Sequence, residues 1–389
     1  MLPVLAFLVA GVVMAQPPAL RVCLGPLAAT DTLLELPEGV PPATVWSEGA
    51  QRAHTQWLPA CAPVHPEATR VLLLRAAGAS RELILRGDSA AGGADTSTDG
   101  PVPRTSGADA EERLLFFGGR RFLRTVTSFD AVQAEEAQKP WQDLFAADGA
   151  LQITKGRGGK YPHHRGVFLG WNKVEHAGLT HDFWHCRAGV SIRHRRFVDA
   201  GSAAGCAAAR LVTEQEWCLA DGKALVRETR SLTAFAGSSF RALDVTIALQ
   251  ALDGPVKLGG DAHHAGFHVR AADAVTATEK ETQVWLPTGE RALGNDIHAD
   301  LHWGGMSFKL EGRTFTLLLI EHPANPAGAV LSARPYGRFG FMPLASLEPA
   351  TPLRLRWRLL VFEGTPPAHE ELARHSASYR VPPRVECLR

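Results

Sequence analysis

Histidines, carboxylates and aromatic residues gather in four segments of the chain, at 161–173, 181–187, 260–270 and 321–337. Histidine titrates near neutral pH and is also a common metal ligand. Aromatic rings pack on the apolar faces of sugars, while His, Asp, Asn and Arg side chains bond to the hydroxyls. The four segments therefore indicate a polar site built from several strands, suited to acid–base, metal or sugar-binding chemistry.

Three histidines from separate segments, His164, His185 and His264, are the candidates for acid–base catalysis or sugar binding. Neighbours on a strand point to opposite faces, so one histidine of each pair, 163–164 and 263–264, supports the site or faces solvent unless the pair lies in a turn. Two carboxylates, Asp261 and Glu216, are the acidic candidates. Glu216 shares a strand face with Glu214, which suits general acid–base work on a sugar and is equally typical of a solvated face.

Further polar and aromatic side chains of the same segments are candidates for holding a substrate. They are His163, Arg165, Trp171, Asn172, Lys173, Asp182, Trp184, Arg270, His322, Asn325, Arg334 and Tyr336. For the tryptophans, packing in the core is the competing interpretation. No cofactor is assigned, but a divalent metal stays open, because two or three clustered histidines could hold copper, zinc or iron. The metal candidates are His163, His164, His185, His263, His264 and His322.

The elements that must position these residues are predicted to be mostly β-strands. Apolar residues alternate with polar ones over 240–249 and 354–362, a period-two pattern typical of antiparallel sheets. An Asp-Gly turn at 221–222 indicates a hairpin, and the apolar run 317–320 predicts a buried strand. The best helix signal covers 368–379. Many strands and few helices predict a mainly β fold, a large antiparallel β-sandwich.

Composition divides the chain into four parts. Residues 1–15 resemble a signal peptide with a Val-x-Ala cleavage site, which predicts an exported protein that is periplasmic or extracellular. A small β domain is expected over 16–88, and 89–110 is poor in large hydrophobes and reads as a flexible linker. Residues 111–389 form the expected large sandwich that carries the site.

Charge and motifs exclude several classes of function. The formal net charge is +1 and no basic tract is present, so the electrostatic pattern of a nucleic-acid binder is missing. Nucleotide-binding, zincin and α/β-hydrolase motifs are absent from the sequence, and no segment after the leader is long enough for a membrane span. Six cysteines permit disulfides, with Cys23–Cys61 favoured and Cys206–Cys218 as a second pair, although free buried thiols are the alternative.

Motifs in the four segments resemble those of exported bacterial proteins of unknown function often labelled "methane oxygenase PmoA". The motifs are Pro-His-His-Arg-Gly at 162–166 with Gly-Trp-Asn-Lys at 170–173, Asp-Phe-Trp-His-Cys at 182–186, Asp-x-x-His-Ala-Gly-Phe-x-x-Arg at 261–270, His-Pro-x-Asn-Pro at 322–326 and Arg-x-Tyr-Gly at 334–337. The chain departs from the family at Glu321, where Asp is usual, and at 331–333, where Leu-Ser-Ala replaces the usual Trp-His.

The resemblance implies a galactose-mutarotase-like β-supersandwich, a fold that commonly binds or cleaves carbohydrates on a concave sheet face. The preferred hypothesis is therefore an exported carbohydrate-active enzyme, a glycoside hydrolase or a related sugar-processing enzyme, with a carbohydrate as its partner. One alternative is a His-ligated metal-dependent enzyme, oxygenase-like as the label suggests. Another is a non-catalytic glycan-binding protein, in which aromatic residues matter and acid–base pairs do not.

Overall fold

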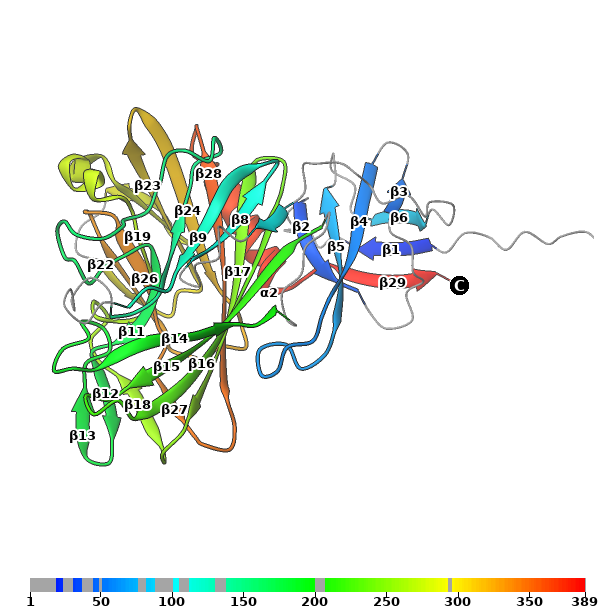
Figure 1. The fold of residues 1–389 in the computed structure, drawn as a ribbon. Helices are drawn as coiled ribbons and strands as arrows, with labels where there is room; N and C mark the ends of the chain where they lie inside the picture. The colour runs from blue at the N-terminus through cyan, green and yellow to red at the C-terminus, as the bar shows by residue number, and fades with distance from the viewer. Residues whose placement is uncertain are drawn as a thin grey trace, which may run out of the picture.

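The fold is built almost entirely from antiparallel strands, as a computed structural model shows (Figure 1). The structure describes residues 19–23, 31–36, 45–48, 51–75, 82–87, 101–104, 112–129, 138–199, 207–292 and 296–388. The mainly β class is confirmed, and the large antiparallel sheets resemble the expected galactose-mutarotase-like supersandwich.

Two nine-stranded sheets make up the large sandwich. The first, called sheet I here, has the order β22-β25-β26-β19-β11-β10-β9-β8-β7. Its strands are β7 (Pro101–Arg104), β8 (Glu112–Phe117), β9 (Arg120–Val126), β10 (Trp141–Leu144), β11 (Val167–Trp171), β19 (Ala265–Arg270), β22 (Asp296–Ala299), β25 (Val330–Arg334) and β26 (Arg338–Met342).

The second large sheet, called sheet II, has the order β14-β15-β16-β17-β28-β24-β23-β20-β21. Its strands are β14 (Ser191–Phe197), β15 (Ala209–Cys218), β16 (Ala224–Ala236), β17 (Phe240–Ala251), β20 (Gln283–Leu286), β21 (Gly289–Ala292), β23 (Trp303–Leu310), β24 (Arg313–Glu321) and β28 (Leu353–Glu363). A 3₁₀ helix, η2 (Asp273–Glu281), precedes β20.

Two smaller sheets flank the sandwich. A four-stranded sheet has the order β13 (Leu179–His181), β12 (Lys173–His176), β18 (Val256–Gly259), β27 (Ala345–Leu347). A seven-stranded N-terminal sheet has the order β2 (Asp31–Glu35), β5 (Thr69–Arg75), β4 (Gln51–Leu58), β3 (Val45–Glu48), β6 (Glu82–Gly87), β1 (Ala19–Cys23), β29 (Arg384–Leu388). The helix α2 (His369–Arg380) matches the best helix signal of the sequence.

The core lies between sheets I and II and follows from the period-two pattern. Phe267 and Val269 of β19 point inward from sheet I, and Leu355 and Trp357 of β28 point inward from sheet II. The rings of Phe267 and Trp357 stack across the two sheets with their centroids 4.6 Å apart. Each large apolar side chain buried there contributes roughly 1.5–3 kcal/mol, so this interface holds the sandwich together.

The same alternation places polar residues on the outer faces of the sandwich. On sheet I, His268, Arg270 and Arg338 lie between the core-facing residues of β19 and β26, and all three are buried beneath loops. On sheet II, Glu216 and Arg356 lie on the opposite outer face, between Trp217 and Trp357 and their core-facing neighbours. The two outer faces therefore present two separate sets of polar groups.

Two strands do not follow the expected domain boundaries. Strand β7 lies inside the expected linker 89–110 and pairs with β8, and β29 leaves the large sandwich to pair with β1. The linker thus contains a strand, and the N-terminal sheet needs residues from the C-terminal part of the chain. The expected signal peptide, 1–15, lies outside the described residues.

The prediction of a Cys23–Cys61 disulfide was wrong. Cys23 and Cys61 are both free thiols in the structure. Cys61 is buried and packs with Val64, Val212 and Ala248, so it behaves as a small hydrophobic residue. Of the second pair, Cys218 is free and Cys206 lies outside the described residues. Across the described ranges, none of the helices is both long and apolar enough to cross a membrane.

Candidate functional site

Three loops bring histidines from distant parts of the sequence together over the outer face of sheet I. His163 precedes β11, His185 follows β13, and His264 precedes β19. The ring centroids of His163 and His185 are 4.4 Å apart, and those of His185 and His264 are 5.3 Å apart. The convergence expected for these three segments is therefore observed, whereas the roles of the histidines remain predictions.

Two of the three histidine loops are shaped by an aspartate that bonds to the loop's own backbone. The Oδ1 atom of Asp182 accepts hydrogen bonds from the backbone N–H groups of Trp184 (3.1 Å) and His185 (2.9 Å). The Oδ1 atom of Asp261 accepts one from the backbone of His263 (2.9 Å). Aspartate is favoured in such turns because its short side chain replaces a backbone acceptor. The two Asp-x-x-His motifs thus form similar local structures.

The same aspartates orient the two imidazoles. Nδ1–H of His185 donates to Oδ2 of Asp182 (2.8 Å), and Nδ1–H of His264 donates to Oδ1 of Asp261 (2.8 Å). A carboxylate can only accept here, so each neutral ring carries its proton on Nδ1 and a lone pair on Nε2. Asn172 supports the second pair by donating to Oδ2 of Asp261 (2.9 Å).

Both aspartates are held in the charged form. Burial alone would raise their pKa values, but the hydrogen bond and charge of the partner histidine lower them further than burial raises them. The net effect is that the pKa of Asp182 and that of Asp261 lie below the ordinary value for aspartic acid. Neither group is therefore suited to donate a proton as a neutral carboxylic acid near neutral pH.

His164 lies beneath the other histidines, with only 2% of its surface exposed. Its ring is 4.2 Å from that of His163 and 5.5 Å from that of Trp184, and neither ring nitrogen has a hydrogen-bond partner among the described residues. Burial, together with the nearby charges of His163 and Arg338, lowers its pKa well below the usual value. His164 is therefore a neutral, buried ring that packs under the site.

A buried lysine that the sequence analysis missed lies under the same loops. The ammonium of Lys139 donates to the backbone carbonyl of Trp184 and lies 4.8 Å from the ring centroid of Phe168. Burial lowers the pKa of Lys139 to about 8. Burial and this lysine lower the pKa of His163 to about 2, so His163 is neutral at physiological pH. Lys139 stands just before β10 in the sequence and carried no motif that would have revealed it.

The floor of the site also contains residues outside the predicted set. His268 of β19 bonds through Nε2 to the carbonyl of Ala265 (2.9 Å), and its Nδ1 accepts from Arg338 (3.0 Å). Arg270, which was predicted as a binding residue, is buried beside them and bonds to Asp273 of η2 (3.1 Å). The alternation of polar and apolar residues in β19 was the signal that could have placed His268 on this face.

An aromatic surface lies at the edge of the histidine cluster. Tyr161 is 40% exposed, and its ring lies 5.0 Å from that of Tyr336 and 5.5 Å from that of His164. The ammonium of Lys160 is 5.5 Å from the Tyr161 ring centroid. Tyr336 was predicted as a binding residue, whereas Tyr161, the first residue of the segment 161–173, was given no role.

The remaining predicted residues on this side of the sandwich support the loops. Trp184 is fully buried and packs against His268 at 4.9 Å. Arg165 is buried over the ring of Trp141 at 4.7 Å. His263 bonds through Nδ1 to Ser332 (2.7 Å). Burial, followed by the nearby charge of Arg334, lowers the pKa of His263 to about 4.

Five predicted residues lie elsewhere, and these are corrections. Glu216 is on the outer face of sheet II, where it is paired with Arg195. Trp171 faces the core and stacks near Trp217, because it follows the inward positions of β11. The other three are His322 beside Tyr379, Asn325 bonded to the Arg356 carbonyl, and Lys173 paired with Glu175.

The histidines are arranged like metal ligands in one respect only. An imidazole whose Nδ1–H bonds to a carboxylate presents Nε2 to a metal in many proteins, and His185 and His264 have this orientation. However, no three His, Cys, Asp or Glu residues of the described ranges are placed together so that they could hold a metal ion. The donor set thus has suitable chemistry, while its positions do not form a coordination shell.

The profile of a family of unknown function (DUF6807) matches residues 114–377, more than half of the chain. No curated protein matches the chain.

Among solved structures, a variant of a glycoside hydrolase family 97 enzyme from Pseudoalteromonas sp. strain K8 is 11% identical over 62% of this chain and 34% of its own, with a TM-score of 0.34. A putative aldose 1-epimerase from Escherichia coli K12 is 10% identical over 67% and 99%, with a TM-score of 0.32. The galactosidase domain of an alpha-galactosidase-sucrose kinase is 9% identical over 66% and 41%, with a TM-score of 0.37. The chain spans about a third of the hydrolase's length, and likeness at this level supports no inference about activity.

Proposed function

We propose that this protein, which belongs to the DUF6807 family of unknown function, is a carbohydrate-active enzyme that moves protons with His185 and His264. The observation that carries the proposal is the pair of imidazoles, each held by its own aspartate, with ring centroids 5.3 Å apart. Two such groups supply a general base and a general acid on the same substrate.

The chemistry depends on the nitrogen that each aspartate leaves free. Asp182 and Asp261 accept the Nδ1 protons, so each Nε2 lone pair is available to take a proton from a hydroxyl or an acidic C–H group. Protonation of one imidazole would be stabilised by its aspartate, and that ring would then act as the acid. The aspartates orient the histidines and are positioning residues.

Hydrolysis by two carboxylates is not supported by this geometry. That mechanism needs one carboxyl group with a raised pKa as the acid and a second as nucleophile or base. Here the pKa values of Asp182 and Asp261 are lowered, and Glu216 lies on the other side of the sandwich. A sugar-processing reaction based on proton transfer by imidazole, such as an isomerisation or elimination, fits the site better.

The surroundings of the histidines suit a polyhydroxylated substrate. The exposed ring of Tyr161 offers a face for a sugar ring to pack on, and half-buried His163 presents a neutral imidazole to its hydroxyls. His264 has 40% of its side chain exposed, so a dissolved substrate can reach it. These contacts would set orientation while His185 and His264 carry out the proton transfer.

The test is turnover of a panel of glycosides, free sugars and sugar acids by the purified full chain. With a substrate in hand, His264→Ala and His185→Ala should each lower kcat by about 10²-fold or more, because each removes one proton-transfer group. The matched control is His176→Ala, which removes a histidine paired with Asp253 (3.6 Å) on β12, outside the cluster. Full activity in both cluster variants would overturn the proposal.

A metal-dependent reaction, as the oxygenase-like label of related proteins suggests, is the second candidate. The observation that favours it is the carboxylate-bound Nδ1 of His185 and of His264, an arrangement common around catalytic metals. Metal analysis of the isolated protein separates the two candidates, since stoichiometric copper, zinc or iron lost in His264→Ala would favour the second. Glycan binding without turnover would instead favour the non-catalytic alternative.

Export to the periplasm or the exterior remains part of the proposal. It rests on the sequence of residues 1–15, and sequencing the N-terminus of the exported protein should find a start at or near Gln16. A mature chain that retains Met1 would contradict cleavage.

A further inference from the structure

A second polar cavity lies between the N-terminal sheet and the outer face of sheet II, on the other side of the sandwich from the histidine cluster. Its volume is about 430 Å³, within the range of small-molecule sites. Residues of β2 and β5 line one wall, and residues of β15, β16, β17 and β28 line the other. Nothing in the proposed histidine chemistry uses this cavity.

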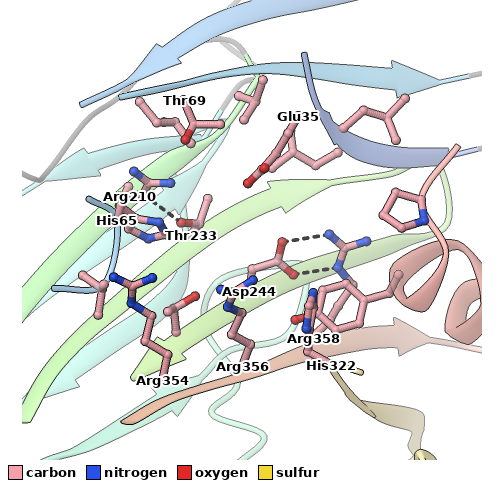
Figure 2. A pocket seen from close by; sticks show the side chains of 18 of the residues that line it. Glu35, His65, Thr69, Arg210, Thr233, Asp244, His322, Arg354, Arg356 and Arg358 are labelled. Atoms are coloured by element: carbon pink, nitrogen blue, oxygen red, sulfur yellow. Dashed lines mark hydrogen bonds and ion pairs between the residues drawn. The ribbon is translucent and has the colours of Figure 1, made fainter. Parts of the chain in front are cut away.

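One wall of the cavity is rich in arginine because of the period-two pattern of β28. Arg354, Arg356 and Arg358 alternate with core residues, so their side chains all leave sheet II on the outer face (Figure 2). Arg210 of β15 joins them from the same face. Guanidinium groups match the geometry of oxyanions, which makes such a wall suited to bind one.

Three of these arginines already have partners. Arg358 forms a two-bond pair with Asp244, at 2.6 and 2.8 Å. Arg354 donates to the carbonyl of Pro63 (2.6 Å), and Arg210 donates to Thr233 (3.2 Å) and to the carbonyl of Pro59 (3.2 Å). The bonds to Pro59 and Pro63 join the N-terminal region to sheet II, whereas the other two lie within that sheet.

Arg356 is different from the other three. Its backbone N–H donates to Asn325 (2.8 Å), but in the described part of the chain its guanidinium makes no hydrogen bond or ion pair. A half-buried guanidinium without an acceptor is costly to desolvate, and an anion in the cavity would compensate for that cost.

A neutral donor stands beside Arg356. Nδ1 of His322 accepts a hydrogen bond from the backbone of Ala324 (3.0 Å), so the proton of the neutral ring is on Nε2. Burial, followed by the charge of Arg356, lowers the pKa of His322 to about 4. Burial and the charges of the surrounding arginines also lower the pKa of His65 to about 3. Both shifts agree with a positive potential in the cavity.

The carboxylates of the cavity do not cancel this charge. Asp244 is occupied by Arg358, and the remaining two, Glu35 and Glu67, are exposed. Figure 2 shows Glu35 on the wall opposite the arginines, where its charge opposes an incoming anion. We propose that this cavity binds a small organic anion whose carboxylate, sulfate or phosphate group is bound by Arg356 with His322 as a second donor.

The experiment measures binding to the full chain by calorimetry, with inorganic phosphate, inorganic sulfate and D-glucuronate as separate probes and D-glucose as the neutral comparison. We expect at least one anion to bind while D-glucose does not, and the preferred probe tells a tetrahedral oxyanion from a carboxylate. Affinity should fall as NaCl is added, because the attraction is between charges. Equal binding of D-glucose and D-glucuronate, or no anion binding at millimolar concentration, would overturn the proposal.

Variants locate the binding in this cavity. Arg356→Gln should weaken the preferred anion by roughly tenfold or more, Arg356→Lys should restore part of the affinity, and Glu35→Gln should strengthen it by about threefold. The matched control is Arg227→Gln, an exposed arginine on the same face of sheet II but outside the cavity, which should bind like the native protein. Thermal unfolding of each variant verifies its fold. If folded Arg356→Gln binds as tightly as the native chain, the assignment is wrong, whatever the outcome at the histidine cluster.

Discussion

In His185 and His264, the aspartate bound at Nδ1 is the reason that Nε2 carries the lone pair. Asp261→Asn replaces a carboxylate that accepts the Nδ1 proton of His264 with an amide that can also donate. The ring should lose its preference for the Nδ1–H tautomer, which ¹⁵N NMR reads directly, and kcat on any substrate found should fall by about 10²-fold or more. Unchanged nitrogen shifts and unchanged kcat would show that Asp261 has only a structural role.

Glu321 allows a separate prediction about stability, because burial raises its pKa to about 7 from an unfolded value of 4.5. A raised pKa means that its contribution is complete below pH 4.5 and is lost as pH rises through 7. Glu321→Gln removes the charge and keeps an acceptor for Asn325. At pH 8 the free energy of unfolding of the variant should therefore exceed that of the native protein by up to roughly 3 kcal/mol, and the variant should unfold at a higher temperature. Near pH 4.5 the two proteins should unfold at the same temperature. A gain that does not depend on pH would contradict this account.

Residue types alone predicted a large part of the histidine cluster. The segments around His164, His185 and His264 stood out because each carries a histidine beside an aromatic and a charged residue. These segments meet, although His164 lies buried beneath the site and His163 is the member of that pair beside His185. Glu216 lies away from the cluster for a physical reason, since the alternation that exposes a carboxylate does not tell which of two outer faces it occupies. Lys139 was missed because its burial depends on loops from elsewhere in the chain.

At the scale of elements, a glycine decides how closely the Asp-Phe-Trp-His-Cys loop approaches β11. A Cβ atom at Gly170 would lie 2.6 Å from the backbone oxygen of Phe183, a contact that only a shift of the loop can relieve. Gly170→Ala should destabilise the fold by roughly 1–3 kcal/mol and displace His185, lowering activity. Gly259→Ala is the control, because its Cβ would meet its nearest atom at 3.7 Å, and thermal unfolding compares the two. Similar unfolding temperatures in both variants would show that the loop yields easily.

The sequence predicted strands where the alternation was clear, but it did not predict which sheet each strand joins. The patterns over 240–249 and 354–362 correspond to β17 and β28, which pair with each other as the antiparallel prediction requires. Strand β29 pairs with β1, which lies near the other end of the sequence, and the short sequence of β29 gives no sign of that partner. Pairings between distant segments depend on the finished fold, so periodicity identifies a strand without naming its neighbour.

For the whole molecule, buried neutral histidines predict instability in acid. Among the described residues, nine histidines have a folded pKa below the unfolded value of 6.5, mainly through burial, whereas two carboxyl groups have a raised pKa and act in the opposite direction. The histidines are His65, His163, His164, His181, His194, His263, His268, His302 and His322, and the carboxyl groups are those of Asp143 and Glu321.

A lowered histidine pKa gives stability that is complete above pH 6.5 and is lost as the pH falls toward the folded value. Nine groups outweigh two, so Tm should fall by several degrees between pH 7 and pH 5. Differential scanning calorimetry in buffers of matched ionic strength measures the change. A Tm that rises toward pH 5 would mean that the carboxyl groups dominate.

The pairing of β29 with β1 also sets an order in time. A ribosome completes β1 early and β29 after every other strand described here, so one edge of the N-terminal sheet stays without its neighbour while the sandwich is being made. Unpaired strand edges invite association with other chains. Nascent chains halted before residue 384 should therefore contain a folded sandwich and an N-terminal sheet that is sensitive to protease.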